Sequence, residues 1–191
     1  MDKRTEIIDA AKKAFRQYGV YKTTLDDIGA NCNMRKNSLY YYFKNKEDLF
    51  REVIKSEFND LLFIEKDFLN NNLPLKEMLR QYFHLRFRMA QQFLKEYELM
   101  KFVNQQVYHQ IFHEETEFLI EEESKIVYAI VHDKVTEGTD INSLITIIIS
   151  INQGLLYKSL FMRHIEPDLE SEIDTIIKFL FNGISIKSTE N

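Results

Sequence analysis

Five polar side chains near the amino terminus have the types and spacing needed to read DNA. Arg35, Lys36, Asn37, Tyr40 and Tyr41 fall mainly on the outward side of a short helical pattern that begins at about residue 35. Lysine and arginine suit phosphates and guanine edges, asparagine can pair with adenine, and tyrosine can bond a phosphate or pack on a thymine methyl. The face has no carboxylate. It therefore predicts a DNA-reading surface, with a helical hairpin that carries a solvated basic face as the alternative.

The elements that must position this face are two short helices joined by a turn of about four residues, which is the layout of a helix-turn-helix. Thr24 and Asp27 form a capping pair, and this predicts a helix start at about Leu25. Leu25, Ile28 and Cys32 recur at helical spacing, so we expect them to face inward.

The turn, the second helix and a preceding helix have signals of their own. Asn33 stands where the turn needs a residue that tolerates left-handed backbone geometry. Leu39 and Phe43 lie four residues apart and would be the buried anchor of the second helix. An earlier apolar stripe, ended by Gly19, predicts a helix that completes a three-helix head. That stripe consists of Ile7, Ile8, Ala11, Ala14, Phe15 and Tyr18.

About fifty residues follow a known signature in order. The matching positions are 7–8, 10–11, 14–15, 19, 23–24, 27–28, 36, 39–40, 42–43 and 44–49. On these residues the chain resembles the TetR (tetracycline-repressor-like) family of transcriptional regulators. Four residues depart from the family pattern: Gly29 replaces an alanine, Asn33 the turn glycine, Arg35 a serine at the helix cap, and Asn37 the next glycine. Because Arg35 and Asn37 stand where the family contacts DNA, we expect a distinct operator.

The resemblance also implies partners and residue roles. It implies a double-stranded, palindromic operator, repression relieved by a small-molecule effector, and a homodimer formed through the last two long helices. A helix from about residue 46 would link the head to the body and transmit the ligand state. The expected DNA-binding residues are Thr24, Arg35, Lys36, Asn37, Tyr40, Tyr41 and Lys46.

Composition supports this organisation. The chain of 191 residues has five glycines and two prolines, so an all-α fold of long helices with brief connections is expected. Residues 1–50 hold ten Lys and Arg against seven Asp and Glu, whereas residues 51–191 hold fifteen against twenty-three. A basic head on an acidic body fits a DNA-binding domain over residues 1–45 and a ligand-binding and dimerisation domain over residues 46–191.

Cysteine content and hydropathy predict a cytoplasmic protein. The single cysteine, Cys32, excludes a disulfide framework within the chain and suits a reducing compartment. No apolar signal sequence follows Met1, and the most apolar stretch, residues 144–156, contains polar residues and falls short of a membrane span. No cofactor is predicted.

Apolar periodicity predicts the helices of the body. They are expected over residues 46–69, 75–99, 101–112, 114–137 and 143–165, with a last helix from residue 167. The helix over residues 143–165 is apolar on nearly every side, as expected where it packs in a four-helix interface between two subunits. Gly154 within it would permit the close approach of a neighbouring backbone.

Aromatic and methionine residues between positions 82 and 162 suit an apolar or aromatic ligand, although core packing explains them equally well. Arg86 lies on the apolar stripe of its helix, so it either pairs with a glutamate of a neighbouring helix or serves as counter-ion for an acidic ligand. The expected ligand-binding residues are Tyr82, Arg86, Met89, Phe93, Phe102, Tyr108, Phe112 and Tyr157.

A rival function is a helical enzyme or a helical protein that binds a metal or small molecule without regulating DNA. His109, His113 and Glu117 stand at four-residue steps and would share one helix face. The spacing does not match His-Glu-x-x-His, and the chain shows no nucleophile–base pair, glycine-rich phosphate loop or two-part metal motif. Neither catalytic residues nor a metal site is predicted.

Overall fold

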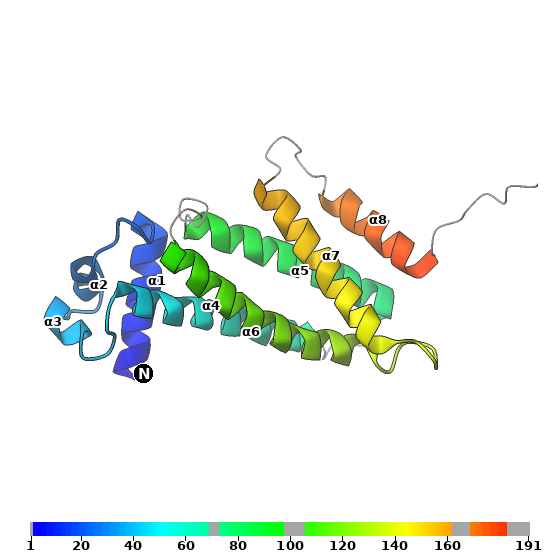
Figure 1. Cartoon of the computed structure of the whole chain (residues 1–191), viewed down its shortest axis with the longest axis horizontal. Helices are drawn as coiled ribbons and strands as arrows, with labels where there is room; N and C mark the ends of the chain where they lie inside the picture. The colour runs from blue at the N-terminus through cyan, green and yellow to red at the C-terminus, as the bar shows by residue number, and fades with distance from the viewer. Residues whose placement is uncertain (1, 69–72, 98–105, 162–168, 183–191) are drawn as a thin grey trace, which may run out of the picture. The chain divides into compact units, whose positions relative to one another are not determined.

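A computed structural model describes residues 2–68, 73–97, 106–161 and 169–182 of the chain. Within these residues all the regular elements are α-helices, which confirms the predicted all-α class (Figure 1). The helices are α1 (Lys3–Tyr18), α2 (Leu25–Asn31), α3 (Lys36–Leu39), α4 (Lys46–Phe68), α5 (Leu75–Glu96), α6 (Gln106–Val131), α7 (Ile141–Phe161) and α8 (Leu169–Asn182).

The chain forms two compact units. The first comprises Met1–Ile64 and Ala90–Lys125, and the second comprises Glu65–Met89 and Ile126–Asn191. Helices α1, α2 and α3 belong wholly to the first unit, whereas α7 and α8 belong to the second. The functional boundary at residue 45 is a different kind of division and stays a prediction.

The head of the first unit depends on side-chain burial, because helices as short as α2 and α3 are not stable alone in water. Ile28, Leu39 and Phe43 are at most 2% exposed. The rings of Phe15 on α1 and Phe50 on α4 meet edge to face, with centroids 5.9 Å apart. Figure 1 shows α2 and α3 next to each other beside α1. The predicted three-helix head is therefore confirmed.

The turn between α2 and α3 has the predicted geometry. Asn33 adopts φ 54°, in the left-handed region. The amide of Met34 donates to the carbonyl of Gly29 at 2.8 Å and folds the turn back onto α2. A Cβ atom on Gly29 would lie 2.4 Å from the carbonyl oxygen of Met34. The departure from alanine at position 29 thus follows from this close backbone approach.

Three predicted helix boundaries are wrong, and one of them is the end of α6, which lies at Val131 rather than at the predicted residue 137. The second helix of the head was expected to reach Phe43, but α3 ends at Leu39 and a turn continues the chain. The predicted break between residues 112 and 114 does not exist, because α6 is continuous from Gln106 to Val131. No proline or glycine interrupts α6 near His113, so the backbone hydrogen bonds can continue through it. Residues 101–105 and 162–168, where other ends were expected, lie outside the described residues.

Helix α7 in the second unit has one buried and one exposed face. Ile145, Ile148, Ile149 and Leu155 are buried, as are Ile173 and Ile177 on α8. Residues 147, 150, 154 and 157 are all exposed and follow the 3-4-3 spacing of a single helix face. Asp140 caps α7, because its carboxylate accepts from the amide of Ser143 at 3.1 Å.

We expect Gly29→Ala to destabilise the head, although alanine is the better helix former by about 1 kcal/mol. The added methyl group must displace the backbone of Met34, so unfolding in urea should show a loss of roughly 1 to 3 kcal/mol. Ala30→Gly, at the exposed neighbouring position, is the control, because it measures only the difference in helix propensity between alanine and glycine. An unchanged or higher stability of Gly29→Ala would contradict the close approach.

Candidate nucleic-acid interface

The outward face of α3 is fully presented to solvent. Arg35, Lys36, Asn37, Tyr40 and Tyr41 are all exposed, and Tyr41 is 87% exposed. On the inner side, Leu39 and Phe43 anchor the helix. Five of the seven predicted DNA-binding residues are therefore exposed in or beside α3.

A carboxylate that sequence analysis did not place lies beside this face. Asp26 on α2 approaches the ammonium group of Lys36 at 3.7 Å, and both side chains are largely exposed. An exposed pair of this kind contributes little to stability. A phosphate could therefore replace Asp26 as the partner of Lys36 at low cost.

Arg35 occupies the N-cap of α3 without capping it. Its backbone is extended, with φ −78° and ψ 148°, and its side chain makes no cap hydrogen bond. A serine there would satisfy an amide at the start of the helix. The exposed side chain of Arg35 is therefore not used for capping and can meet an anion.

Thr24 is exposed, but its hydroxyl group is already used. The predicted capping box is confirmed: Oγ1 accepts from the amide of Asp27 at 3.2 Å and donates to its Oδ2 at 2.7 Å. The Asp27 carboxylate also accepts from the Thr24 amide at 2.8 Å. These bonds from Thr24 lower the pKa of Asp27 and keep it ionised. A DNA contact by Thr24 must share an oxygen with this cap.

Lys46 also has partners within the protein. Its ammonium group donates to the carbonyl oxygens of Val20, Tyr21 and Thr23 at 3.0, 3.2 and 3.1 Å. These three carbonyls belong to the connection between α1 and α2. Burial lowers the pKa of Lys46, with Glu47 acting in the opposite direction. The first residue of α4 therefore fastens the connection that leads into α2, and its predicted phosphate contact stays a prediction.

A match to a known family accompanies this geometry. Residues 7–53 match the model described as bacterial regulatory proteins, tetR family. The matched segment covers most of α1, all of α2 and α3, the Lys46 contacts and the first turns of α4. In this segment the chain is similar to the tetR family of bacterial regulatory proteins.

Several relatives agree with this match. A negative transcriptional regulator of the biofilm operon icaADBC, IcaR from Staphylococcus epidermidis, is 41% identical over 69 residues, which cover 36% of this chain and 35% of that protein. The aligned part thus spans about a third of that relative. A transcriptional regulator from Cytophaga hutchinsonii is 28% identical with a TM-score of 0.65, over 90% of both chains. FadR from Bacillus subtilis, solved with stearoyl-CoA, shares the fold at 21% identity, with a TM-score of 0.61 over 96% of this chain and all of that one.

The predicted ligand residues fall into two groups. In the first unit, the rings of Phe93 and Phe112 stack with centroids 6.2 Å apart, and both side chains are partly exposed. Tyr108 is buried, and its hydroxyl donates to Glu47 at 3.0 Å. Burial raises the pKa of Tyr108, as does Glu47. Phe102 lies outside the described residues.

The other group belongs to the second unit. Tyr82 and Arg86 are buried, Met89 is partly exposed, and Tyr157 is 62% exposed. Arg86 lies 3.3 Å from the carboxylate of Glu65 on α4, and both side chains are almost fully buried. The salt-bridge interpretation of Arg86 is therefore realised, while a role for it toward an acidic ligand stays a prediction.

Metal ligands, surface pockets and helix hydropathy complete the description of possible sites. Within the described part of the chain, no group of three or more His, Cys, Asp or Glu could hold a metal ion. His113 approaches Glu117 at 3.6 Å, and the side chain of His109 is outside the described set. Two surface pockets in the first unit, of about 670 and 320 Å³, are not lined by the predicted ligand residues. Among the described helices, none has the length and apolarity to cross a membrane.

We expect Lys46→Met to lower the free energy of unfolding by roughly 1 to 3 kcal/mol, because three carbonyl acceptors lose a charged donor. Lys44→Met, an exposed lysine two residues earlier, should change it by less than about 0.5 kcal/mol. Urea unfolding measures both. If Lys46 serves only as a phosphate contact, its variant would keep full stability and instead reduce the salt dependence of DNA binding by about one unit.

Proposed function

We propose that this chain is a DNA-binding transcriptional regulator that acts as a homodimer on a palindromic operator. We further propose that it is a repressor, released when a small apolar or aromatic molecule binds the body. The observation that carries the DNA-binding part is the exposure of Arg35, Lys36, Asn37, Tyr40 and Tyr41. This run in and beside α3 has two cations, an amide and two phenols and no carboxylate. The name of the relative IcaR as a negative regulator supports repression.

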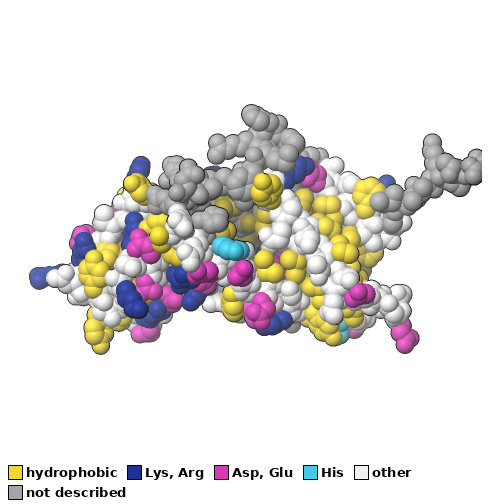
Figure 2. Space-filling model, viewed as in Figure 1, with side chains coloured by type: hydrophobic (Ala, Val, Ile, Leu, Met, Phe, Trp, Pro, Cys, Tyr) yellow, Lys and Arg dark blue, Asp and Glu magenta, His cyan; other side chains and the backbone are white. Residues whose placement is uncertain are grey.

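The homodimer is supported by the exposed face of α7. Ile147 is 49% exposed and Tyr157 is 62% exposed, and Phe179 on α8 is 52% exposed. In Figure 2, hydrophobic side chains gather on the surface over α7. A Cβ atom on Gly154 would meet nothing within 4 Å in the described chain, so a helix of a second subunit has room to approach there. An exposed apolar stripe with the 3-4-3 spacing is suited to helix–helix pairing.

The effector is supported by chemistry and by analogy of fold. Phe58, Phe93 and Phe112 form an aromatic cluster with ring centroids 5.9 to 6.2 Å apart, and two of its members are partly exposed. Such a cluster favours an apolar or aromatic molecule. FadR, which has this fold, was solved with stearoyl-CoA. A regulator that binds chromosomal DNA would work in the cytoplasm.

Selection of bound genomic fragments tests the proposal directly. Purified protein should retain fragments that share an inverted repeat with half-site centres about one helical turn, or a multiple of it, apart. Binding should weaken steeply with salt, because phosphate contacts release counter-ions. Retention of no sequence in preference to random DNA, or undiminished operator binding by a monomer in light scattering, would contradict the proposal.

We expect Asn37→Gly to relax base selection at one position in each half-site. If the amide pairs with adenine, the variant should lose roughly 1 to 3 kcal/mol on the operator. A binding profile over all single-base operator variants measures this. Asn31→Gly, an exposed asparagine at the end of α2, is the control and should leave the profile unchanged. An unaltered profile for Asn37→Gly would exclude Asn37 from base readout.

We expect Gly154→Leu to weaken dimer formation while the subunit still folds, because its side chain meets open space within the described chain. Replacing a helical glycine should itself favour α7 by up to about 1 kcal/mol. Sedimentation equilibrium should show a larger dimer dissociation constant, while helical content stays constant. Glu121→Leu on an exposed part of α6 is the control. Equal dimer stability in both variants would place the interface elsewhere.

A further inference from the structure

We propose that Tyr97 is a positioning residue for operator binding, because it joins the aromatic cluster of the first unit to the ion pairs that hold α1. This inference rests on the proposed regulatory function and adds a route by which the body can control the head. All of the residues that carry it belong to the first compact unit. Tyr97 follows directly after α5 and is 0% exposed.

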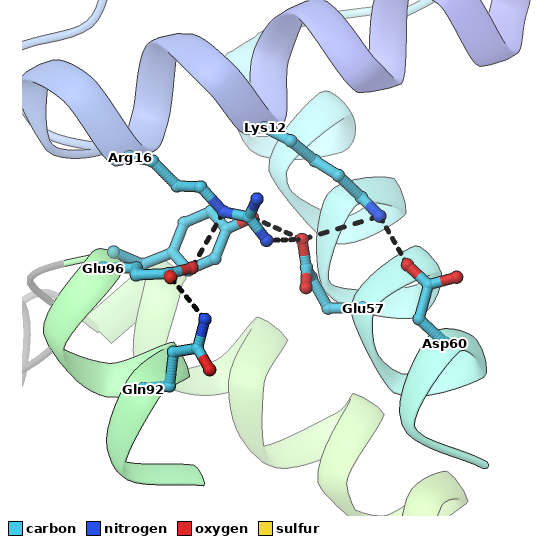
Figure 3. A network of polar contacts seen from close by, with 7 residues as sticks. Lys12, Arg16, Glu57, Asp60, Gln92 and Glu96 are labelled. Carbon is cyan, nitrogen blue, oxygen red and sulfur yellow. Dashed lines mark hydrogen bonds and ion pairs between the residues drawn. The ribbon is translucent and has the colours of Figure 1, made fainter. Parts of the chain in front are cut away.

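The centre of the arrangement is the carboxylate of Glu57 on α4 (Figure 3). Its Oε1 atom accepts from the hydroxyl of Tyr97 at 2.6 Å and from the guanidinium of Arg16 at 2.8 Å. The ammonium group of Lys12 lies 3.5 Å from the same oxygen and 2.8 Å from Asp60. Two cations of α1 are therefore drawn to α4 through one acidic side chain.

Arg16 extends the connection to α5. Its Nε atom pairs with Glu96 at 2.9 Å, and its guanidinium carbon lies 5.6 Å from the ring centre of Tyr97. Gln92 donates to the other oxygen of Glu96 at 2.7 Å, which fixes the orientation of that carboxylate. Arg16 thus bridges α4 and α5, and the face of the Tyr97 ring lies against the bridge.

The centre of this network is more shielded than an ordinary surface pair, although the side chain of Arg16 is 42% exposed. The side chain of Glu57 is 14% exposed and that of Lys12 is 12% exposed. Burial raises the pKa of Tyr97, and Glu57 raises it further, so the phenol remains a hydrogen-bond donor at neutral pH. Several charges that share one shielded carboxylate act as a unit, whereas an isolated exposed pair contributes little.

Tyr97 also contacts the predicted ligand residues. The ring centroids of Tyr97 and Phe93 are 4.8 Å apart, and Phe93 stacks on Phe112. A molecule that enters this cluster must move Phe93 or Phe112, since packed rings leave little free space. A displacement of Tyr97 by about 1 Å would break its hydrogen bond to Glu57. Glu57 would then lose its hydrogen bond from Tyr97, and Arg16 would lose its contact with the ring.

The consequence for DNA binding follows from the position of Arg16 near the end of α1. Helix α1 packs against α2, and α2 packs against α3. Fixing α1 on α4 and α5 therefore pre-orients the recognition face before DNA arrives, which favours the operator over random DNA. Random DNA needs only cationic contacts and should be less sensitive to orientation.

Tyr97→Phe tests this proposal because it removes the hydroxyl and keeps the ring. Operator affinity should fall about fivefold or more, a typical size for coupling between sites, while affinity for random DNA stays within about twofold. Tyr21→Phe, at a 65% exposed tyrosine of the head, is the matched control and should leave both affinities unchanged. Equal operator affinity of Tyr97→Phe and wild type would overturn the proposal.

A double-mutant cycle tests the link to the aromatic cluster. Phe93→Leu should change operator affinity in the wild-type background and have little further effect in the Tyr97→Phe background, so the two changes should be non-additive by about threefold or more. Phe118→Leu, at a 49% exposed residue of α6, should be additive with Tyr97→Phe. Additivity of Phe93→Leu with Tyr97→Phe would break the proposed route.

The distance between the two heads of a dimer is a further measurement, and a loss of stability alone would not change it. Spin labels on Lys13→Cys, an exposed position of α1, should report the distance between the two heads of a dimer, since Cys32 is only 3% exposed. Tyr97→Phe should broaden that distance distribution without DNA. An unchanged distribution would contradict a positioning role. If the wild-type protein selects no operator, the regulatory function and this inference both fail, whereas normal operator binding with unaffected variants would overturn this inference alone.

Discussion

The burial of a few apolar side chains beneath α2 and α3 is the constraint on which the DNA-reading surface depends. These helices have only seven and four residues, so their own hydrogen bonds do not offset the unfavourable free energy of helix nucleation. Leu39 and Phe43 anchor the outer face, and Ile28 anchors α2 beneath it. The buried residues therefore determine which way the polar residues of the recognition face point. A polar substitution of Leu39 would remove the face without touching any DNA-binding residue.

Some cations of the head pair with groups inside the protein, whereas others are exposed and can meet DNA. Arg4 pairs with Glu52 on α4 and lies over the ring of Phe43, while Arg16 and Lys46 are held by carboxylates and carbonyls of the first unit. The cations of the outer face, Arg35 and Lys36, have no strong partner of this kind among the described residues. The basic excess of residues 1–50 is thus a poor measure of DNA affinity. What matters is the direction in which each cation points.

Sequence patterns predicted the features that depend on local geometry. The capping box of Thr24 and Asp27, the left-handed Asn33 and the inward anchors Leu39 and Phe43 all follow from neighbours within a few residues. The contacts that were missed join residues far apart in the chain. Lys46 reaches carbonyls more than twenty positions earlier, and Tyr97 reaches Glu57 across forty. Helical periodicity carries no information on such pairs, since it shows only which side of a helix is buried.

A ligand could bind either through an ion pair with Arg86 or through the aromatic rings of Phe93 and Phe112, and helical periodicity does not distinguish these two possibilities. A buried cation on an apolar stripe was recognisable in Arg86, but its partner Glu65 is twenty-one residues away on another helix and was not. Removing one member of a buried ion pair is costly, so an acidic ligand at Arg86 would compete with Glu65 for the guanidinium group. An apolar or aromatic ligand at Phe93 and Phe112 faces no such exchange, because rings can separate without leaving a charge behind. The lower cost of moving rings, together with their direct contact with Tyr97, makes the aromatic cluster the better place for a ligand to influence the head.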